Sequence, residues 1–231
     1  MHNGYVIGNY QTYTDFEKVC ILRHDIDVDI AKAVKFAEIE HAMDGVQASY
    51  FVLLNTSFYN AFEARNIKGI KKIANLGHLV GLHFDETQYV WGKNINCLTE
   101  YILKEVNLLE QIIEIPVNII SMHRPSKFLL ESNLCVPGII NTYSALFFKD
   151  FKYLSDSMHT WREDAEKIII DGKFKRIHIL THPFWYTDQP ETMRDKVYNF
   201  IINGNLQLYN ELHKSVLPNI NNLIKQEEIE I

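Results

Sequence analysis

The chain has 231 residues, of which 47% are hydrophobic and 23% charged, an ordinary composition for a globular protein. This is enough apolar material for one sizeable core, so we expect a single domain over residues 1–231. The formal net charge of -6 provides no basic field for a nucleic acid or an anionic membrane, and we expect neither as a partner.

The cysteines and the N-terminus both favour a cytoplasmic protein. Cys20, Cys97 and Cys135 lie far apart and outside any CxxC pattern, so neither a disulfide framework nor a thiolate zinc site is indicated. Residues 1–5 lack the basic start and apolar stretch of a signal peptide. No apolar run approaches the length needed to span a membrane.

The first predicted element is a strand over residues 19–29, an apolar run that ends in carboxylates and an imidazole. Because side chains alternate along a strand, Asp25 and Asp27 share one face while His24 lies on the other. Two carboxylates this close repel each other unless a cation or a shared proton lies between them. The alternative is an acidic turn that caps the following helix.

Strands and helices then alternate along the chain. Strands are predicted over residues 19–29, 48–54, 78–83, 118–122, 139–141, 153–156 and 176–181. Helices are predicted over residues 30–41, 67–75, 98–113, 193–201 and 206–216. Asp44-Gly45 is expected to stop the first helix, Asn203-Gly204 to separate the last two, and residues 226–231 to fray.

Strands interleaved with helices imply a largely parallel sheet, either closed as a barrel or open and doubly wound. Polar side chains of chemically capable types follow the carboxyl ends of separate strands: Asp25 and Asp27, His83 and Asp85, His123 and Arg124, Asp156, and His182. In a barrel these ends converge on one face, where such enzymes build their sites, so this regularity favours a barrel.

Five short motifs, in this order along the chain, resemble those of the polysaccharide deacetylase family of carbohydrate esterases (NodB-homology, carbohydrate esterase family 4-like). The resemblance covers the chain from Ile21 to about Tyr186. It implies an α/β fold, a distorted (β/α)7-type barrel in a single domain. It also implies a metal-dependent hydrolase that removes an N-acetyl group from an amino sugar or a surface-polysaccharide precursor.

The first two motifs suggest a base and metal ligands. By resemblance Asp25 is the general base and Asp27 a metal ligand, although the two family residues are adjacent and Ile26 separates them here. The second motif, Gly77-His78-Leu79-Val80-Gly81-Leu82-His83, makes His83 a metal ligand.

The family's second liganding histidine, four residues after the first, is replaced by Thr87. We expect His123 to supply the third ligand, with Asp85 as the second choice. His78 lies at the start of its strand and is expected to be a core or turn histidine.

The third motif, Arg124-Pro125, suggests an arginine that contacts the catalytic carboxylate and keeps it ionised, the alternative being a surface arginine before a proline turn. The fourth motif, Asp156 with Trp161, resembles the family's Asp and Trp, which implies that Asp156 orients the catalytic histidine and that Trp161 walls the substrate groove. Trp91 or Trp185 is the alternative stacking surface for a sugar.

The fifth motif is Leu180-Thr181-His182-Pro183. By resemblance His182 is the general acid that protonates the leaving amine, and Leu180 lines a pocket for the acetyl methyl group. The alternative for His182 is a buried histidine with a structural hydrogen bond.

The implied cofactor is one divalent metal ion, with zinc the leading candidate and cobalt, nickel or manganese compatible with the same ligands. A deformylase or another amidohydrolase on a small N-acyl substrate is the second enzymatic reading. Thr87 also leaves open a catalytically degenerate carbohydrate-binding protein. In each case the expected partner is a small molecule or an oligosaccharide.

Overall fold

The structure is a computed structural model that describes residues 4–44 and 46–229. The chain divides into two compact units, with the boundary between Tyr186 and Thr187. The first unit contains the sheet and every candidate site residue, and the second contains one long helix. A single catalytic domain over residues 1–231 stays a prediction.

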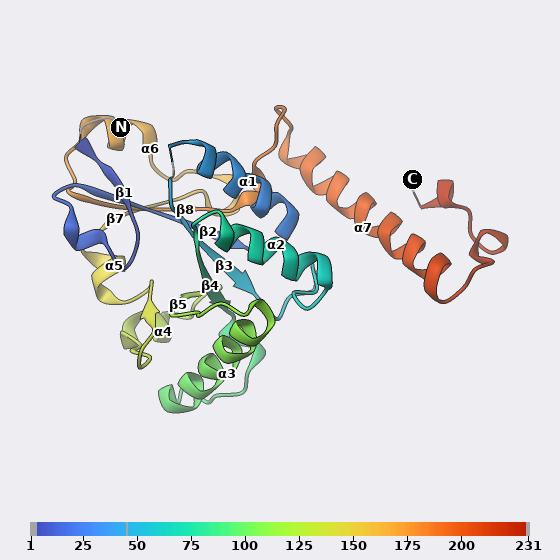
Figure 1. Ribbon diagram of the computed structural model, residues 1–231, viewed down its shortest axis with the longest axis horizontal. Helices are drawn as coiled ribbons and strands as arrows, with labels where there is room; N and C mark the ends of the chain where they lie inside the picture. Colours follow the sequence, from blue (N-terminus) through green and yellow to red (C-terminus); the bar gives the residue numbers. More distant parts are fainter. Residues whose placement is uncertain (1–3, 45, 230–231) are drawn as a thin grey trace. The chain divides into compact units, whose positions relative to one another are not determined.

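The first unit is built on a parallel sheet (Figure 1). Its strands are β1 (Val6–Gly8), β2 (Val19–Ile26), β3 (Ser49–Leu53), β4 (Leu79–Phe84), β5 (Ile119–Met122), β6 (Ile140–Asn141), β7 (Lys152–Ser155) and β8 (Arg176–Thr181). The order is β6-β5-β4-β3-β2-β8-β7, with β1 also paired to β2, and each pair is parallel. Among the described strands, β6 and β7 at the two ends of this order do not pair with each other, so the barrel is distorted and open there, and the predicted fold class is confirmed.

Helices connect the strands, and most of them pack on the outer face of the sheet. They are α1 (Ile30–Ala42), α2 (Ala64–Asn75), α3 (Ile95–Ile113), α4 (Lys127–Ser132), α5 (Ala145–Lys149) and α6 (Ala165–Asp171). Asp29 caps α1 by accepting a hydrogen bond from the backbone N–H of Lys32, and Asn94 caps α3 in the same way. Both caps fix where the helix begins, because they accept hydrogen bonds from backbone N–H groups that have no partner within the first helical turn.

Successive side chains of β2 point to opposite faces of the sheet, as the sequence predicts, so the two faces carry different polar groups. His24 points outward, where its Nε2 lies 2.9 Å from Oε1 of Glu40 on α1. Arg23 and Asp25 point inward, above an inner core that contains Ile21 and Phe51. The strand therefore buries polar groups on both faces, and each of these groups has a partner.

The predicted strands are all found, and the differences lie in short or interrupted elements. The strand β1 and the helices α4, α5 and α6 were not predicted, because segments this short show no periodicity in the sequence. The predicted break at Asn203-Gly204 is wrong, since one helix, α7 (Met193–Ser215), runs through it. A glycine inside a helix costs only about 1 kcal/mol relative to alanine, which the rest of a long helix can offset.

Two predicted stops fall partly outside the described residues. The first helix ends at Ala42, as expected, but Gly45 lies outside the described part of the chain. In the expected frayed tail, residues 226–228 form a single 3-10 turn, and residues 230–231 lie outside the described part.

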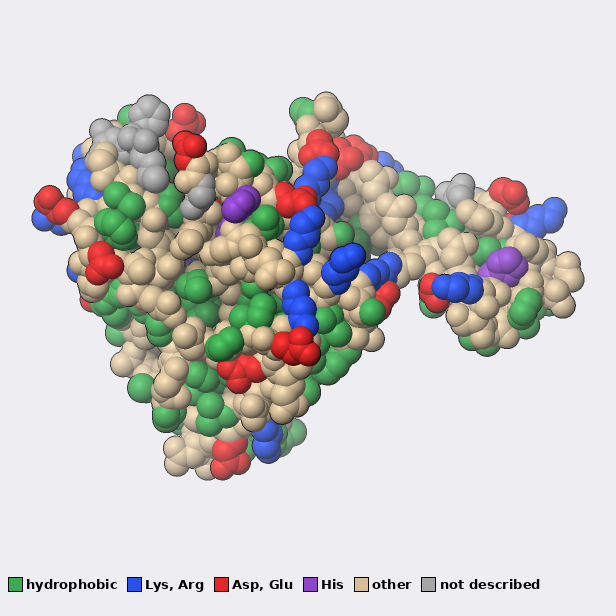
Figure 2. All heavy atoms as spheres, viewed as in Figure 1, with side chains coloured by type: hydrophobic (Ala, Val, Ile, Leu, Met, Phe, Trp, Pro, Cys, Tyr) green, Lys and Arg blue, Asp and Glu red, His purple; other side chains and the backbone are tan. Residues whose placement is uncertain are grey.

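The surface agrees with the modest net charge of the sequence. On the face drawn in Figure 2, Lys and Arg side chains are interspersed with Asp and Glu side chains. Among the helices described, none is both long and apolar enough to cross a bilayer.

Candidate metal centre and catalytic site

Three side chains from separate strand ends offer ligand atoms to one point. These are Asp27, just after β2, His83 near the end of β4, and His123, just after β5. Oδ1 of Asp27 lies 3.1 Å from Nε2 of His83 and 3.4 Å from Nδ1 of His123. The two imidazole nitrogens lie 3.1 Å from each other. The three atoms thus form a small triangle, as the ligands of one cation do.

The hydrogen bonding and the chemical types of these three ligand atoms are compatible with a bound transition metal ion. Oδ1 of Asp27 is buried yet receives no hydrogen bond, although two nitrogens lie near it. Nδ1 of His83 lies 2.6 Å from the hydroxyl of Ser121, which leaves Nε2 free to bind a cation. Two imidazole nitrogens and one carboxylate oxygen are a ligand set typical of zinc and of related divalent metals.

Burial alone would raise the pKa of Asp27, but His123 and His83 beside it outweigh burial and hold that pKa well below its ordinary value. The carboxylate is therefore ionised across the neutral range, as a metal ligand must be.

The alternative third ligand, Asp85, is used for structure instead. Its Oδ1 accepts hydrogen bonds from both the backbone N–H and the hydroxyl of Thr87, at 3.0 and 2.7 Å. Its Oδ2 accepts one from Gln88 at 3.2 Å. Asp85 thereby caps a short 3-10 turn, residues 86–88, and the geometry favours His123 over Asp85 as the third ligand.

Asp25, the predicted base, lies beside this triangle and is held by an arginine. Its Oδ2 lies 3.6 Å from Nε2 of His83. Arg23 donates two hydrogen bonds to its two carboxylate oxygens, from Nε at 2.9 Å and from a terminal nitrogen at 2.7 Å. Burial raises the pKa of Asp25, but the charge of Arg23 and then that of His83 outweigh it and lower the pKa overall.

The contact predicted for Arg124 is therefore made by another residue. Arg124 directs a terminal nitrogen toward Oδ2 of Asp85 at 3.4 Å, and its side chain is 71% exposed. Its backbone φ of 48° turns the chain just after the strand. The correction is that Arg23, not Arg124, makes the contact with Asp25 that was predicted for Arg124.

His182 and Asp156 form the pair that the fourth and fifth motifs suggest. Nδ1 of His182 lies 2.7 Å from Oδ1 of Asp156, whose Oδ2 also accepts the backbone N–H of His182 at 3.0 Å. Nε2 of His182 faces the metal triangle, 3.8 Å from Oδ2 of Asp27. Burial lowers the pKa of His182, but the hydrogen bond to Asp156 and the charges of Asp25 and Asp27 raise it above its ordinary value.

The predicted substrate-lining residues lie on β8 and in the loops after β7 and β8. Leu180 is buried on β8, two residues before His182 and in register with Arg23 on β2. Trp185 is half-buried in the turn after β8, with its ring centroid 5.4 Å from that of His159. Trp161 is 39% exposed, in the loop that follows β7.

His78 is a core histidine, as expected. Its Nδ1 accepts a hydrogen bond from the backbone N–H of Ala48 at 3.1 Å, and its Nε2 lies 3.0 Å from the carbonyl of Ala37.

Sequence reasoning missed Arg23 and Ser121. The alternation of side chains along a strand could have identified both. Arg23 is two residues before Asp25 on one strand, and Ser121 is two residues before His123 on another. A side chain two positions away lies on the same face, one step deeper into the barrel.

No family model and no curated protein matches this chain. Three solved structures illustrate what its fold is similar to. A CE4 family pseudoenzyme from Bacillus anthracis has 13% identity and a TM-score of 0.45, over 81% of this chain and 62% of its own. A family 4 carbohydrate esterase from Bacillus anthracis has 14% identity and a TM-score of 0.46, over 87% of this chain and 83% of its own. A family 4 acetyl xylan esterase from Clostridium thermocellum, in complex with a cobalt ion, has 13% identity and a TM-score of 0.44, over 85% of this chain and 91% of its own. The chain thus spans less than two thirds of the length of the pseudoenzyme it resembles.

Proposed function

We propose that this protein is a metal-dependent hydrolase of the polysaccharide deacetylase type that removes an N-acetyl group from an amino sugar. The proposal is carried by one observation, the convergence of Asp27, His83 and His123 on one point, with Asp25 and His182 directly beside it. A base, an acid and a cation site within one small volume are the parts that hydrolysis of an amide requires.

Asp27, His83 and His123 would hold the cation, with zinc the first choice and cobalt, nickel or manganese compatible. A bound divalent cation would polarise the acyl carbonyl and lower the pKa of a water molecule. Asp25 accepts the proton of the attacking water. Arg23 holds the carboxylate of Asp25 in place, since a paired guanidinium fixes both oxygens at once.

His182 supplies the second proton. Nδ1 of the ring is held by Asp156, so the ring is oriented with Nε2 toward the site. The pKa of His182, raised above its ordinary value, favours the protonated ring, which is the form a general acid needs before the amine departs. Leu180 would contact the acetyl methyl group, and Trp161 or Trp185 would stack on the sugar.

The direct test is release of acetate from N-acetylated amino sugars by protein loaded with zinc. The proposal is supported if His182→Ala releases no acetate. It is supported further if chelation stops acetate release by the unsubstituted protein and added metal restores it. Release of formate from an N-formyl sugar, without acetate, would replace it with the deformylase reading. Sugar binding without hydrolysis of any N-acyl substrate, and without a thermal shift on adding metal, would leave a non-catalytic carbohydrate-binding protein.

A cytoplasmic location belongs to the same proposal and makes a sugar precursor the expected substrate, not a mature extracellular polymer. Fractionation of cells that produce the full-length protein tests this part independently of the activity.

A further inference from the structure

A chain of buried polar side chains lies on the outer face of the sheet, behind the strand ends that carry the candidate site. Nδ1 of His24 on β2 lies 2.6 Å from Oγ1 of Thr181 on β8, and Nε2 lies 2.9 Å from Oε1 of Glu40 on α1. The hydroxyl of Tyr50 on β3 donates a hydrogen bond to Oε2 of Glu40 at 2.6 Å. All four side chains belong to buried residues, and the mechanism proposed above uses none of them.

The ring of His24 is held in one orientation by its neighbours. The ring centroid of Phe36 on α1 lies 5.0 Å from that of His24, and the ring centroid of Tyr50 lies 4.6 Å from it. Burial alone would raise the pKa of Glu40, but the charge and hydrogen bond of His24 and the hydrogen bond of Tyr50 outweigh burial and lower that pKa. A carboxylate only accepts hydrogen bonds, so Nε2 of His24 donates to Glu40 and Nδ1 is left for Thr181.

The bridge from His24 to Thr181 lies where the two strands separate. His24 and Thr181 are the last register pair of β2 and β8 among the described residues. His182, the proposed acid, is the next residue of the chain and caps the turn that follows. Adjacent side chains of a strand point to opposite faces, so a hydrogen bond at Thr181 fixes the chain directly behind His182. His24 immediately precedes Asp25, the proposed base, in the same way.

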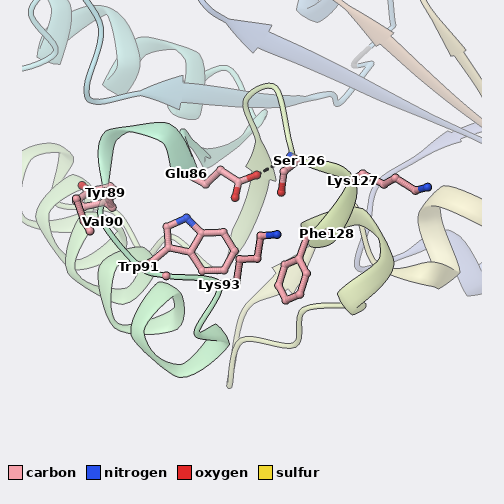
Figure 3. Close-up of a pocket in the computed structure, with 9 residues that line it drawn as sticks. Glu86, Tyr89, Val90, Trp91, Lys93, Ser126, Lys127 and Phe128 are labelled. Carbon is pink, nitrogen blue, oxygen red and sulfur yellow. Dashed lines mark hydrogen bonds between the residues drawn. The ribbon is translucent and has the colours of Figure 1, made fainter.

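A different bond ties the loops on the metal side of the site. The backbone N–H of Ser126 donates a hydrogen bond to Oε1 of Glu86 at 2.5 Å and so joins the loop after β4 to the loop after β5 (Figure 3). These two loops follow His83 and His123. The bridge through His24 therefore acts on the strand that carries the acid, while the loops after two of the metal ligands are joined without it.

We propose that His24 is a positioning residue for the reaction: through its hydrogen bond to Thr181 it sets the place of His182 relative to Asp25. This inference rests on the proposed function, which makes His182 the acid and Asp25 the base. It gives the two nitrogens of one imidazole separate tasks, because Nδ1 positions the acid while Nε2 joins β2 to α1 through Glu40. Substitutions that replace one nitrogen at a time can therefore separate the two tasks.

The test uses asparagine and glutamine in place of His24. The amide of asparagine stands two bonds from Cβ, as Nδ1 does, and the amide of glutamine stands three bonds from Cβ, as Nε2 does. His24→Asn can therefore keep the bond to Thr181, and His24→Gln can keep the bond to Glu40. In acetate release by the full-length, zinc-loaded protein, His24→Gln should lower kcat at least about tenfold with KM within about twofold, since a displaced catalytic group slows the chemical step. His24→Asn should keep kcat within about threefold.

Stability should follow the opposite order, which a merely structural role of His24 would not produce. His24→Asn leaves the buried carboxylate of Glu40 without its imidazole partner, whereas His24→Gln keeps a donor there. In urea denaturation, His24→Asn should therefore unfold at the lower concentration, although it is the more active of the two variants.

Two substitutions of Thr181 test the other end of the bridge. Thr181→Val keeps the shape of the side chain but removes the hydroxyl, so it should lower kcat as His24→Gln does. Thr181→Ser keeps the hydroxyl and should retain kcat. His78→Asn is the matched control, because Nδ1 of His78 lies 3.9 Å from Oε2 of Glu40 but the residue precedes β4, at the other end of the strands, and it should leave kcat unchanged.

Crystal structures of the zinc-loaded variants give a readout that does not depend on activity. In His24→Gln and Thr181→Val the ring of His182 should move by at least about 0.5 Å relative to Asp25, the tolerance within which catalytic groups must be held. The three metal ligands should keep their places. Circular dichroism and zinc content establish that each variant is folded and loaded.

An unmoved ring of His182, equal kcat in His24→Asn and His24→Gln, or the same order for kcat and stability would overturn the positioning role. Acetate release at an unchanged rate by Thr181→Val would overturn it too and leave the proposed function standing. Displacement of His182 in variants of a protein that releases no acetate from any N-acetylated sugar would do the reverse.

Discussion

Arg23 donates two hydrogen bonds to Asp25 from only two residues earlier on the same strand, and both side chains are almost fully buried. The guanidinium also packs on two rings, with its central carbon 4.7 Å from the centroid of Tyr143 and 5.4 Å from that of Phe51. Without Arg23, the buried carboxylate of Asp25 would lose the partner that offsets most of its cost of desolvation.

The first prediction separates the two candidate arginines. Arg23→Met should lower the free energy of unfolding by about 3–5 kcal/mol, because it leaves Asp25 charged and buried. Arg124→Ala should change it by no more than about 0.5 kcal/mol, because that side chain is 71% exposed. Urea denaturation of both variants checks this, and a larger loss for Arg124→Ala than for Arg23→Met would contradict the assignment.

The second prediction concerns the metal ligands. Asp27→Ala, His83→Ala and His123→Ala should each abolish stoichiometric zinc binding, measured by elemental analysis after dialysis. They should also abolish the stabilisation by zinc, which amounts to about 2.7 kcal/mol at a metal concentration one hundred times Kd.

Asp85→Asn is the matched control for this set, since asparagine can still cap the turn that begins at Asp85. It should retain one zinc ion per chain. A variant of Asp85 that loses the metal while His123→Ala keeps it would reverse the choice of the third ligand.

The third prediction separates proton donation from metal binding. His182→Ala should lower kcat by about 10²–10⁴ while zinc content stays unchanged, because the imidazole supplies a proton and is not needed to hold the cation. Asp156→Asn should lower kcat with a smaller change in KM, since Asp156 both orients His182 and helps to raise its pKa. Loss of zinc in either variant would place these residues among the ligands instead.

The fourth prediction concerns pH and a buried carboxyl group outside the site. Burial, aided by the charge of Asp85, raises the pKa of Glu105 on α3 to about 7. The folded protein therefore holds this proton at pH values where the unfolded chain has lost it, so its contribution to stability falls as pH rises from about 4.3 to above 7.

Glu105→Gln should remove this loss, because glutamine still accepts the hydrogen bond of the Tyr89 hydroxyl. The free energy of unfolding of Glu105→Gln, minus that of the unsubstituted protein, should be larger at pH 8 than at pH 5, by up to about 3 kcal/mol. Chemical denaturation at both pH values measures this difference, with Glu100→Gln, an exposed position on the same helix, as control. A difference that does not depend on pH would contradict the raised pKa.

The sequence by itself determined the alternation of strands and helices and the shared face of Asp25 and Asp27. It also placed His83, His123, Asp156 and His182 at the carboxyl ends of strands. These features are local, since apolar periodicity and the alternation of side chains act over a few residues. That is also why α4, α5 and α6 escaped prediction, and why a glycine within α7 was mistaken for a break.

Only the tertiary structure decided which residues complete the site. The sequence offers both His123, the first choice, and Asp85 as the third ligand. In the structure Asp85 accepts hydrogen bonds from Thr87 and Gln88, while the ring of His123 faces Asp27. Likewise Arg124 follows its strand at a turn, whereas Arg23 lies inside the barrel on the same face as Asp25. The direction of a side chain beyond the end of a strand depends on the turn that follows and on neighbours distant in sequence, and neither can be read from residue spacing.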